Sequence, residues 1–362
     1  MGLLCGLCVL CERIFFSFRF LRVGLFFMSC LLRVENLQVD IGLAAGDLHA
    51  VRGVSFSLEK GKTLGLVGES GCGKSISALA LMNLLPPRAR RRASRLEFAG
   101  RDLLAMSEEQ MMEVRGNRMA MIFQEPMTSL NPAYTIGDQL SEALLCHGRG
   151  TRAEAMDRAV FLLEKVGITA AARRLRQYPH QLSGGLRQRV MIAMALMCGP
   201  EMIIADEPTT ALDVTIQAQI LLLLAQIQKE FQMAMILITH DLGVVSTVAD
   251  NVAVMYAGQI VEQGTTEEIF LDPLHPYTQG LFNCLPIPGR TPRGTHLGSI
   301  PGKVPSLIGV FGGCGFANRC PYAREICTRN EIALTETQNN RAYRCVLPLE
   351  QCRRNAGMKA DR

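Results

Sequence analysis

The sequence has no apolar run long enough to cross a membrane. The longest uncharged runs near the N-terminus, Met1 to Cys11 and Val23 to Leu32, are about half of the roughly 20 residues that a span needs. The basic residues follow the first run instead of preceding it, and no A-x-A-like cleavage site is present. We therefore expect neither a transmembrane helix nor a signal peptide.

The chain also lacks a strong excess of either charge. Its 38 Lys and Arg residues against 33 Asp and Glu residues give a net charge of +5 over 362 residues, which is too mild to indicate a nucleic-acid binder. Disorder is excluded as the main state, because a chain of this length with 48% hydrophobic residues can bury a sizeable core. The 13 cysteines occur without a secretory context, so we expect thiols or metal ligands rather than disulfides.

Residues 1–30 are interpreted as an N-terminal extension. Met28 stands just before an alternating, strand-like segment from Leu32 to Val39. Translation can therefore begin at Met28, with residues 1–27 an upstream artefact or a poorly ordered extension. From about residue 31, short β-rich runs alternate with helical ones, which indicates an α/β protein.

A phosphate-binding loop follows the short apolar strand that we expect at Thr63 to Gly68. The loop fits the pattern G-x-x-x-x-G-K-[ST] and precedes a helical run from Ser75 to Leu85. Glycines let such a loop curl closely around phosphates, and its amides and the helix N-terminus face the anion. We expect Lys74 to contact the β and γ phosphates of ATP and Ser75 to bind Mg²⁺. The predicted nucleotide-binding residues here are Gly68, Glu69, Ser70, Gly71, Cys72, Gly73, Lys74 and Ser75.

Two further apolar strands are expected to end in polar side chains at the same sheet edge. The first, Glu201 to Glu207, delivers the adjacent carboxylates of Asp206 and Glu207 at its C-terminal end, where open α/β sheets bind ligands. We expect Asp206 to hold Mg²⁺ and Glu207 to polarise the attacking water. The second, Ala234 to Thr239, places His240 along this edge.

Other local patterns place secondary structure around these motifs. Met119 to Phe123 reads as a strand that runs into Gln124. Thr151 and Glu154 form a capping-box pattern before an amphipathic helix at residues 152–167. The basic run Arg88 to Arg95 is interpreted as a solvated loop, with contact to phosphate or lipid headgroups as the alternative.

The segment that begins at Leu182 carries a more specific signal. It reads Leu-Ser-Gly-Gly-Leu-Arg-Gln-Arg and resembles the signature of ATP-binding-cassette (ABC) ATPases. The other elements of that family occur in the expected order across about residues 31–270, including Ala211-Leu212-Asp213 before His240. The resemblance implies a P-loop NTPase fold with a RecA-like core, an antiparallel β subdomain and a helical subdomain.

The resemblance also implies a composite ATP site. In this family two cassettes pair head to tail, and each ATP lies between the phosphate loop of one and the signature of the other. The amides of Ser183, Gly184 and Gly185 would then face the γ-phosphate of the partner's ATP. Because the chain has one set of motifs, a second chain is required, either related or identical. The remaining implied roles are Glu207 as general base, His240 as γ-phosphate contact, Gln124 as water and Mg²⁺ sensor, and Asp213 as inter-subunit contact.

Two further segments resemble one particular group within this family. Residues 123–132 (Phe-Gln-Glu-Pro-Met-Thr-Ser-Leu-Asn-Pro) and 275–278 (His-Pro-Tyr-Thr) are similar to the dipeptide, oligopeptide and nickel importer group. This implies a peripheral subunit on the cytoplasmic face of the inner membrane that powers peptide uptake, with nickel or glutathione as alternative solutes. Its implied partners are two membrane permeases, a second ATPase subunit and a periplasmic or extracellular solute-binding protein, and no nucleic acid is implied. Residues 124–145 would contact the permeases.

The sequence departs from the family pattern at two positions. Where the family places an aromatic residue to stack on adenine, this chain has Ile41, so we expect adenine to be held by aliphatic contact. Cys72 stands where serine is common, and a thiol at a helix N-terminus favours its thiolate. We therefore expect alkylation of Cys72 to block ATPase activity and ATP to protect it.

The remaining part of the chain, residues 271–362, is a small cysteine-rich tail. Its spacing Cys314-x5-Cys320-x6-Cys327-x17-Cys345 could supply four thiolates to a [4Fe–4S] cluster or to Zn²⁺. In the importer group, a similar C-terminal cysteine set resembles the ligand set of an iron–sulfur cluster. The resemblance therefore favours a cluster over zinc, and unligated thiols are the third possibility.

Two other functions were weighed. A soluble ABC ATPase acting on ribosomes or DNA commonly fuses two cassettes or carries long helical arms, and neither pattern is visible. A small-molecule kinase could use the same phosphate loop, but the segment from Leu182 argues against it.

Overall fold

The computed structural model describes residues 30–125, 129–209, 212–284, 298–309, 312–337 and 341–360. The proposed start at Met28 and nearly all of the predicted N-terminal extension lie outside these residues. So do residues 126–128 of the importer-type motif, together with Ala211.

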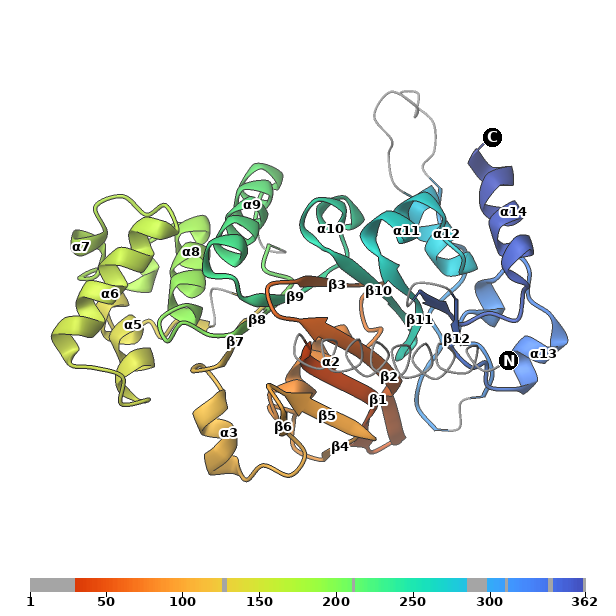
Figure 1. The fold of residues 1–362 in the computed structure, drawn as a ribbon, viewed down its shortest axis with the longest axis horizontal. Helices are drawn as coiled ribbons and strands as arrows, with labels where there is room; N and C mark the ends of the chain where they lie inside the picture. Colours follow the sequence, from red (N-terminus) through yellow and green to blue (C-terminus); the bar gives the residue numbers. More distant parts are fainter. Residues whose placement is uncertain are drawn as a thin grey trace, which may run out of the picture.

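An eight-stranded sheet forms the centre of the molecule (Figure 1). Its strand order is β12-β13-β11-β10-β3-β9-β8-β7, and the strands from β10 to β7 are parallel. The predicted apolar strands β3, β8 and β9 are confirmed, and every residue in them is buried, as expected for a parallel sheet covered on both faces. The bounds are β3 (Thr63–Val67), β7 (Met119–Ile122), β8 (Met202–Asp206), β9 (Ala234–Thr239), β10 (Asn251–Tyr256), β11 (Gln259–Thr265), β12 (Thr335–Glu336) and β13 (Ala342–Tyr343).

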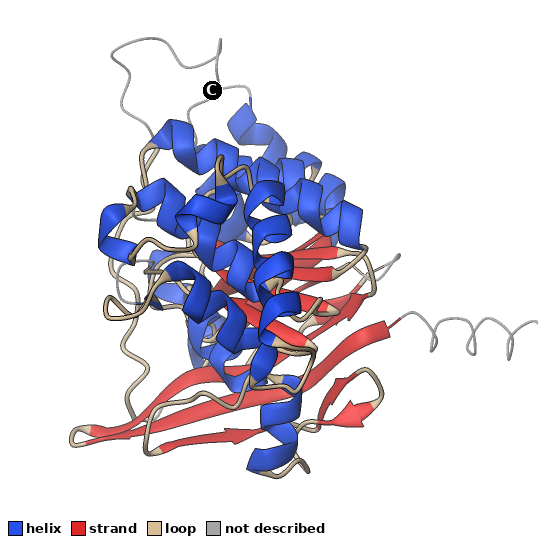
Figure 2. Ribbon diagram, turned by 90° about the vertical axis from the view of Figure 1, so that its left-hand side faces the viewer, coloured by secondary structure: helices blue, strands red, loops and turns tan. Residues whose placement is uncertain are grey.

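A second, antiparallel sheet packs beside the first, and its two long strands are prominent in Figure 2. One hydrophobic core joins the two sheets and helix α2 (Lys74–Leu81), with Leu32 and Val54 from the antiparallel sheet and Leu66 and Ile236 from the parallel one. The strand order is β2-β1-β5-β6, and β4 also pairs with β1. The bounds are β1 (Cys30–Leu43), β2 (Gly46–Glu59), β4 (Ala89–Arg92), β5 (Arg95–Phe98) and β6 (Arg101–Asp102).

The expectation of a solvated loop at Arg88 to Arg95 is wrong. Most of this run forms strands β4 and β5, because its backbone pairs antiparallel with β1. Arg92 forms an ion pair with Asp40 at 2.5 Å. Between the exposed arginines, Arg91 turns inward and donates hydrogen bonds to the carbonyl oxygens of Ala80 and Leu103.

Helices cover the parallel sheet, and α5 to α8 form a helical lobe at one end of the molecule (Figure 1). The predicted capping box at Thr151 and Glu154 is confirmed at the start of α6. The bounds are α2 (Lys74–Leu81), α3 (Glu108–Val114), α5 (Ile136–Leu145), α6 (Arg152–Lys165), α7 (Ala171–Arg174), η1 (Pro179–Gln181), α8 (Gly184–Ala195), α9 (Val214–Phe231), α10 (Leu242–Val248) and α11 (Thr266–Leu271).

The C-terminal part of the chain is joined to the central sheet. Strand β13 pairs antiparallel with β11, through Tyr343 opposite Glu262 and Ala342 opposite Gln263. Around it lie α12 (Pro276–Asn283), η2 (Ala317–Arg319), α13 (Glu325–Arg329) and α14 (Leu349–Ala360). Within the described residues, no helix combines the length and apolar character needed to cross a bilayer.

A buried polar network ties the C-terminal part to strand β11. The carboxylate of Glu262, which is fully buried, accepts hydrogen bonds from the backbone N–H groups of Leu274 (2.7 Å) and His275 (2.9 Å) and pairs with Arg341 at 3.1 Å. His275 is 1% exposed, and its Nδ1 accepts the N–H of Tyr277 at 3.0 Å to cap α12. Burial lowers the pKa of His275 from 6.5 to about 3, so the folded protein holds a neutral imidazole.

His275 should make the fold less stable in acid. In the unfolded chain the imidazole of His275 is protonated below pH 6.5, whereas in the folded protein it stays neutral down to about pH 3. Between these two pH values the unfolded state therefore binds more protons, and the free energy of unfolding decreases as the pH falls. From about pH 7.5 to about pH 5 we expect His275 to account for a loss of about 2 kcal/mol. Denaturant titrations of wild type and His275→Asn, which keeps a capping acceptor, measure this loss. An equal loss in the variant would show that the imidazole is not responsible.

Candidate active site

The phosphate loop is held between the two sheets by close backbone contacts. A Cβ atom on Gly68 would lie 2.1 Å from the carbonyl oxygen of Met255 in β10, and one on Gly73 would lie 2.4 Å from that of Ala50 in β2. Both glycines also have positive φ angles, 155° and 102°, which other residues rarely adopt. Only glycine fits at either position, so the loop path is fixed by its surroundings.

Lys74 begins helix α2 and points back over the loop. Its side chain is buried, and Nζ donates hydrogen bonds to the carbonyl oxygens of Gly68 at 2.8 Å and Glu69 at 3.0 Å. The ammonium group therefore lies inside the curve of the loop, where the sequence places the phosphates.

The expectation of a reactive thiolate at Cys72 is wrong. The side chain is 1% exposed, and burial raises the pKa of its thiol more than the neighbouring Lys74 ammonium lowers it. The general rule that a helix N-terminus favours the thiolate is outweighed here by removal of the sulfur from water.

Ser75 and Asp206 meet at the start of α2 and the end of β8. The Ser75 hydroxyl donates to Oδ1 of Asp206 at 2.9 Å. Asp206 is 5% exposed, and burial raises the pKa of its carboxyl, opposed by the hydrogen bond from Ser75. A hydroxyl and a carboxylate are oxygen ligands of the kind that Mg²⁺ prefers, so this pair fits the predicted magnesium site.

The next carboxylate, Glu207, faces two other predicted residues. Its Oε2 accepts a hydrogen bond from Nε2 of Gln124 at 3.2 Å and lies 3.7 Å from Nδ1 of His240. The backbone of Glu207 has a φ of 44°, and its N–H donates to the carbonyl oxygen of Ile238 in β9 at 2.9 Å. Glutamate rarely adopts this left-handed conformation, and backbone strain of this kind clusters at functional sites.

Other predicted residues occupy the starts of helices or a strand. Ser183 caps α8 by accepting the N–H of Leu186 at 3.4 Å, so Gly184 and Gly185 form its first turn in the helical lobe. Asp213 caps α9 in the same way. Ile41 lies in β1 and packs against the core between the sheets.

The predicted iron–sulfur site is not supported, and neither is zinc. Among the described residues, which include all four predicted ligands Cys314, Cys320, Cys327 and Cys345, no group of three or more His, Cys, Asp or Glu side chains is placed to hold a metal ion. Cys345 lies beside Cys352, and a hydrogen bond from the Cys352 thiol lowers the pKa of Cys345.

Two residues that the sequence did not assign reach the phosphate loop from the C-terminal part. The hydroxyl of Tyr277 accepts the N–H of Glu69, and Arg319 pairs with the Glu69 carboxylate. Tyr277 belongs to the importer-type segment 275–278, but its sequence context gave no sign of this contact. Nothing in the sequence around Arg319 singles it out.

Comparison with known proteins identifies the family. A model described as ABC transporter matches residues 51–210, and one described as oligopeptide/dipeptide transporter, C-terminal region, matches residues 261–327. A probable peptide ABC transporter ATP-binding protein of Sinorhizobium fredii is 51% identical over 87% of this chain and 94% of its own length. The dipeptide transport ATP-binding proteins DppD of Bacillus subtilis and Escherichia coli are 49% and 48% identical, covering 88% and 90% of this chain and 95% and 98% of their own lengths.

This chain belongs to the ATP-binding proteins of peptide ABC transporters. Solved ABC structures share its fold. CbiO1 of Clostridium perfringens, part of the ABC transporter complex cbiONQ, matches with a TM-score of 0.57 at 28% identity over 67% of this chain and 91% of its own. The dimeric ATP-binding cassette MJ0796, bound to ADP and Pi, matches with a TM-score of 0.59 at 24% identity over 65% and 99%. The predicted ABC ATPase fold is therefore confirmed.

Because the thiol of Cys72 is buried, we expect it to resist alkylation in this ABC ATPase. In the native protein we expect N-ethylmaleimide to label the exposed Cys146 well before Cys72, and we expect ATPase activity to survive the early labelling. Peptide mapping by mass spectrometry at successive times measures both rates, and denatured protein, in which both thiols react, serves as the control. Labelling of Cys72 at the rate of Cys146 in native protein would contradict the burial argument.

Proposed function

We propose that this protein is the ATP-hydrolysing subunit of a peptide importer and that its hydrolytic site is built from the residues described above. The observation that carries the proposal is the arrangement at one sheet edge. Ser75 contacts Asp206 beside the phosphate loop, and Gln124 and His240 both face Glu207. This arrangement provides a phosphate cradle, an oxygen pair for a cation and a carboxylate beside it.

In this proposal each group has one task. The loop amides and Lys74 bind the phosphates of ATP, while Ser75 and Asp206 hold Mg²⁺, which when bound neutralises phosphate charge. Glu207 accepts a proton from the water that attacks the γ-phosphorus, and ADP leaves. Gln124 and His240 orient the Glu207 carboxylate and the γ-phosphate.

The proposed site is completed by a second ATPase subunit, related or identical. Ser183, Gly184 and Gly185 would present the N-terminus of α8, a helix of 12 residues, to the ATP of the partner. Asp213 would lie at the contact between subunits, and Ile41 would contact adenine. The 24%-identical cassette MJ0796, whose structures are dimeric, shares the fold on which this pairing depends.

We also propose the division of the chain and its partners. Residues 31–270 form the ABC ATPase domain, residues 271–362 the oligopeptide-transporter-type region and residues 1–30 an extension. The relatives named for dipeptide and oligopeptide transport support a peptide as the solute. The proposed partners are two permeases and a solute-binding protein, and the proposed position is peripheral, on the cytoplasmic face of the inner membrane.

Replacing the proposed base tests the catalytic assignment. We expect Glu207→Gln to lower the ATPase rate by about 100-fold or more, since general-base catalysis contributes at least this much, and to keep ATP binding. The matched control is Glu230→Gln, whose parent carboxylate pairs with Lys165 on the surface and should leave the rate unchanged. Steady-state phosphate release and equilibrium ATP binding measure the two properties. A normal rate in Glu207→Gln would remove Glu207 from this role.

Reconstitution tests the transport function. The protein is co-expressed with candidate permeases and a candidate second ATPase subunit, and the complex is placed in proteoliposomes with a solute-binding protein. We expect ATP-dependent uptake of a labelled dipeptide that Glu207→Gln abolishes. Uptake of nickel or glutathione instead would transfer the assignment to those solutes. Co-purification with ribosomes or DNA and no permease would favour a non-transport ATPase.

A further inference from the structure

Glu69, the second residue of the phosphate loop, is held by residues more than 200 positions further along the chain. Its backbone N–H donates to Oη of Tyr277 at 2.9 Å. Its carboxylate accepts two bonds from Arg319, one from Nη1 to Oε2 at 2.8 Å and one from Nη2 to Oε1 at 3.1 Å. This paired geometry is the strong, directional form of an arginine–carboxylate contact. Both the backbone and the side chain of one loop residue are therefore fixed from outside the loop.

Arg319 is itself rigidly placed. Its side chain is 6% exposed, and the two bonds to Glu69 are joined by bonds to Oη of Tyr256 (3.1 Å) and to the carbonyl oxygens of residues 300 and 301 (3.1 and 3.0 Å). These bonds use all five N–H donors of a guanidinium group. Its guanidinium also lies 5.7 and 5.9 Å from the ring centres of Tyr256 and Phe316. A lysine could not reproduce this set of contacts.

Tyr277 takes its position from the central sheet. Its ring is fully buried against that of Tyr256, with ring centres 4.6 Å apart. Its backbone N–H donates to Nδ1 of His275, and the backbone N–H of His275 donates to the carboxylate of Glu262 in β11. A continuous series of hydrogen bonds thus runs from a core strand, through the start of α12, to the backbone of the phosphate loop.

The contacts at Glu69 also influence the position of Lys74, the residue expected to contact the phosphates. The carbonyl oxygen of Glu69 accepts a hydrogen bond from Nζ of Lys74 at 3.0 Å, so a shift of Glu69 also moves the ammonium group. The neighbouring Gly71 has no heavy atom within 4 Å of a Cβ built on it and a φ of 78°. At Glu69, by contrast, both the backbone and the side chain are held by residues outside the loop.

We propose that Arg319 and Tyr277 are positioning residues for ATP binding, through which the C-terminal region keeps the phosphate loop in its binding conformation. The proposal rests on the proposed function only in taking this loop as the ATP site. When the two contacts are lost, the loop samples other conformations, and the apparent dissociation constant rises in inverse proportion to the fraction that remains competent. Neither residue touches the reacting atoms, so the effect appears in nucleotide affinity and KM more than in kcat.

The sharpest variant is Tyr277→Phe, which removes the hydroxyl and keeps the buried ring. We expect the dissociation constant for Mg·AMP-PNP and the KM for ATP to rise about fivefold, the effect of one lost hydrogen bond, with kcat changed less than twofold. Tyr343→Phe is the matched control, because Tyr343 is also buried in the C-terminal region and donates to the carbonyl oxygen of Leu347. It should lose comparable stability and keep normal nucleotide affinity.

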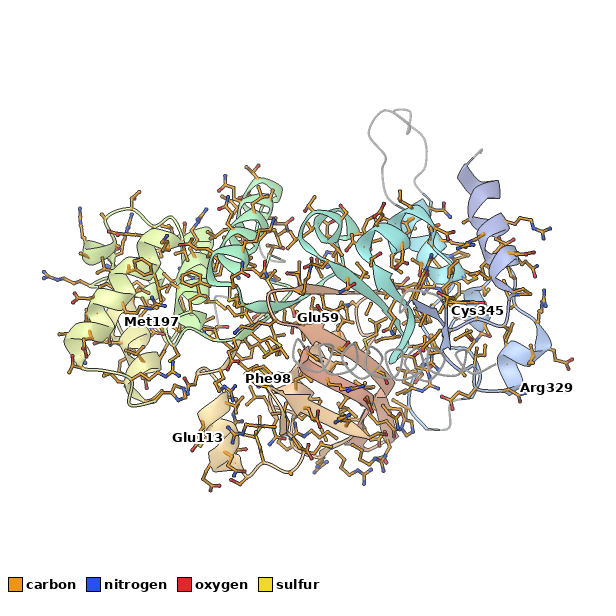
Figure 3. The ribbon with its side chains drawn as sticks, in the orientation of Figure 1. Glu59, Phe98, Glu113, Met197, Arg329 and Cys345 are labelled. Carbon is orange, nitrogen blue, oxygen red and sulfur yellow. The ribbon has the colours of Figure 1, made fainter. Side chains whose placement is uncertain are left out.

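Arg319 is tested through its coupling to Glu69. We expect Arg319→Lys and Glu69→Gln each to weaken Mg·AMP-PNP binding, and the double variant to cost less than the sum of the two. Arg329→Ala is the control, since Arg329 lies at the outer edge of the C-terminal region and pairs with the exposed Glu325 (Figure 3). Nucleotide affinity should be unchanged in this variant.

The measurements separate the possible outcomes. If Tyr277→Phe and Arg319→Lys lose stability but bind Mg·AMP-PNP with wild-type affinity, the contacts are structural only and the proposal is overturned. Additive effects at Arg319 and Glu69 would also overturn it. Because binding is measured with a nucleotide that is not hydrolysed, these results do not depend on whether Glu207 is the base or a peptide is the solute.

Discussion

The structure depends above all on the fit of the phosphate loop against two backbone carbonyl groups. Gly68 lies against Met255 in β10 and Gly73 against Ala50 in β2, so the loop is placed jointly by the parallel and antiparallel sheets. Helix α2 starts from this fixed point, which sets the direction of its N-terminal amides and of Ser75. The distance from Ser75 to the end of β8 then follows from the register of β3, β9 and β8 in one sheet. The antiparallel sheet therefore helps to set the path of the phosphate loop.

Two adjacent carboxylates at the end of β8 acquire different properties from this arrangement. Asp206 still belongs to the strand, is nearly inaccessible and has a pKa raised by burial. One residue later the backbone turns into the left-handed region, and Glu207 faces Gln124 and His240 instead. A carboxylate beside a hydroxyl suits a cation, and one beside an amide and an imidazole suits a water molecule. The turn at Glu207 is what separates the two environments.

Much of this site could be predicted from the sequence because its signals are local. Buried parallel strands such as Ala234–Thr239 read as short apolar runs, and the capping box at Thr151 depends on residues three positions apart. The failures arise where a distant part of the chain decides. The arginines near Arg91 read as a solvated loop until cross-strand partners are known. At Cys72 a local rule favoured the thiolate, but packing removed the thiol from water.

The contacts between the C-terminal part and the phosphate loop are also long-range, so the sequence alone does not predict them. Tyr277 and Arg319 are 208 and 250 positions from Glu69, and residue type alone does not say which loop a buried tyrosine or arginine will reach. Once folded, strand β13 joins the central sheet and the Glu262 network fixes α12, so the region is joined to the sheet that carries the phosphate loop. A segment that looked like a cysteine-rich appendage is thereby mechanically continuous with the phosphate loop. Because Tyr277 and Arg319 both contact Glu69, a displacement of this segment would reach the phosphate loop at that residue.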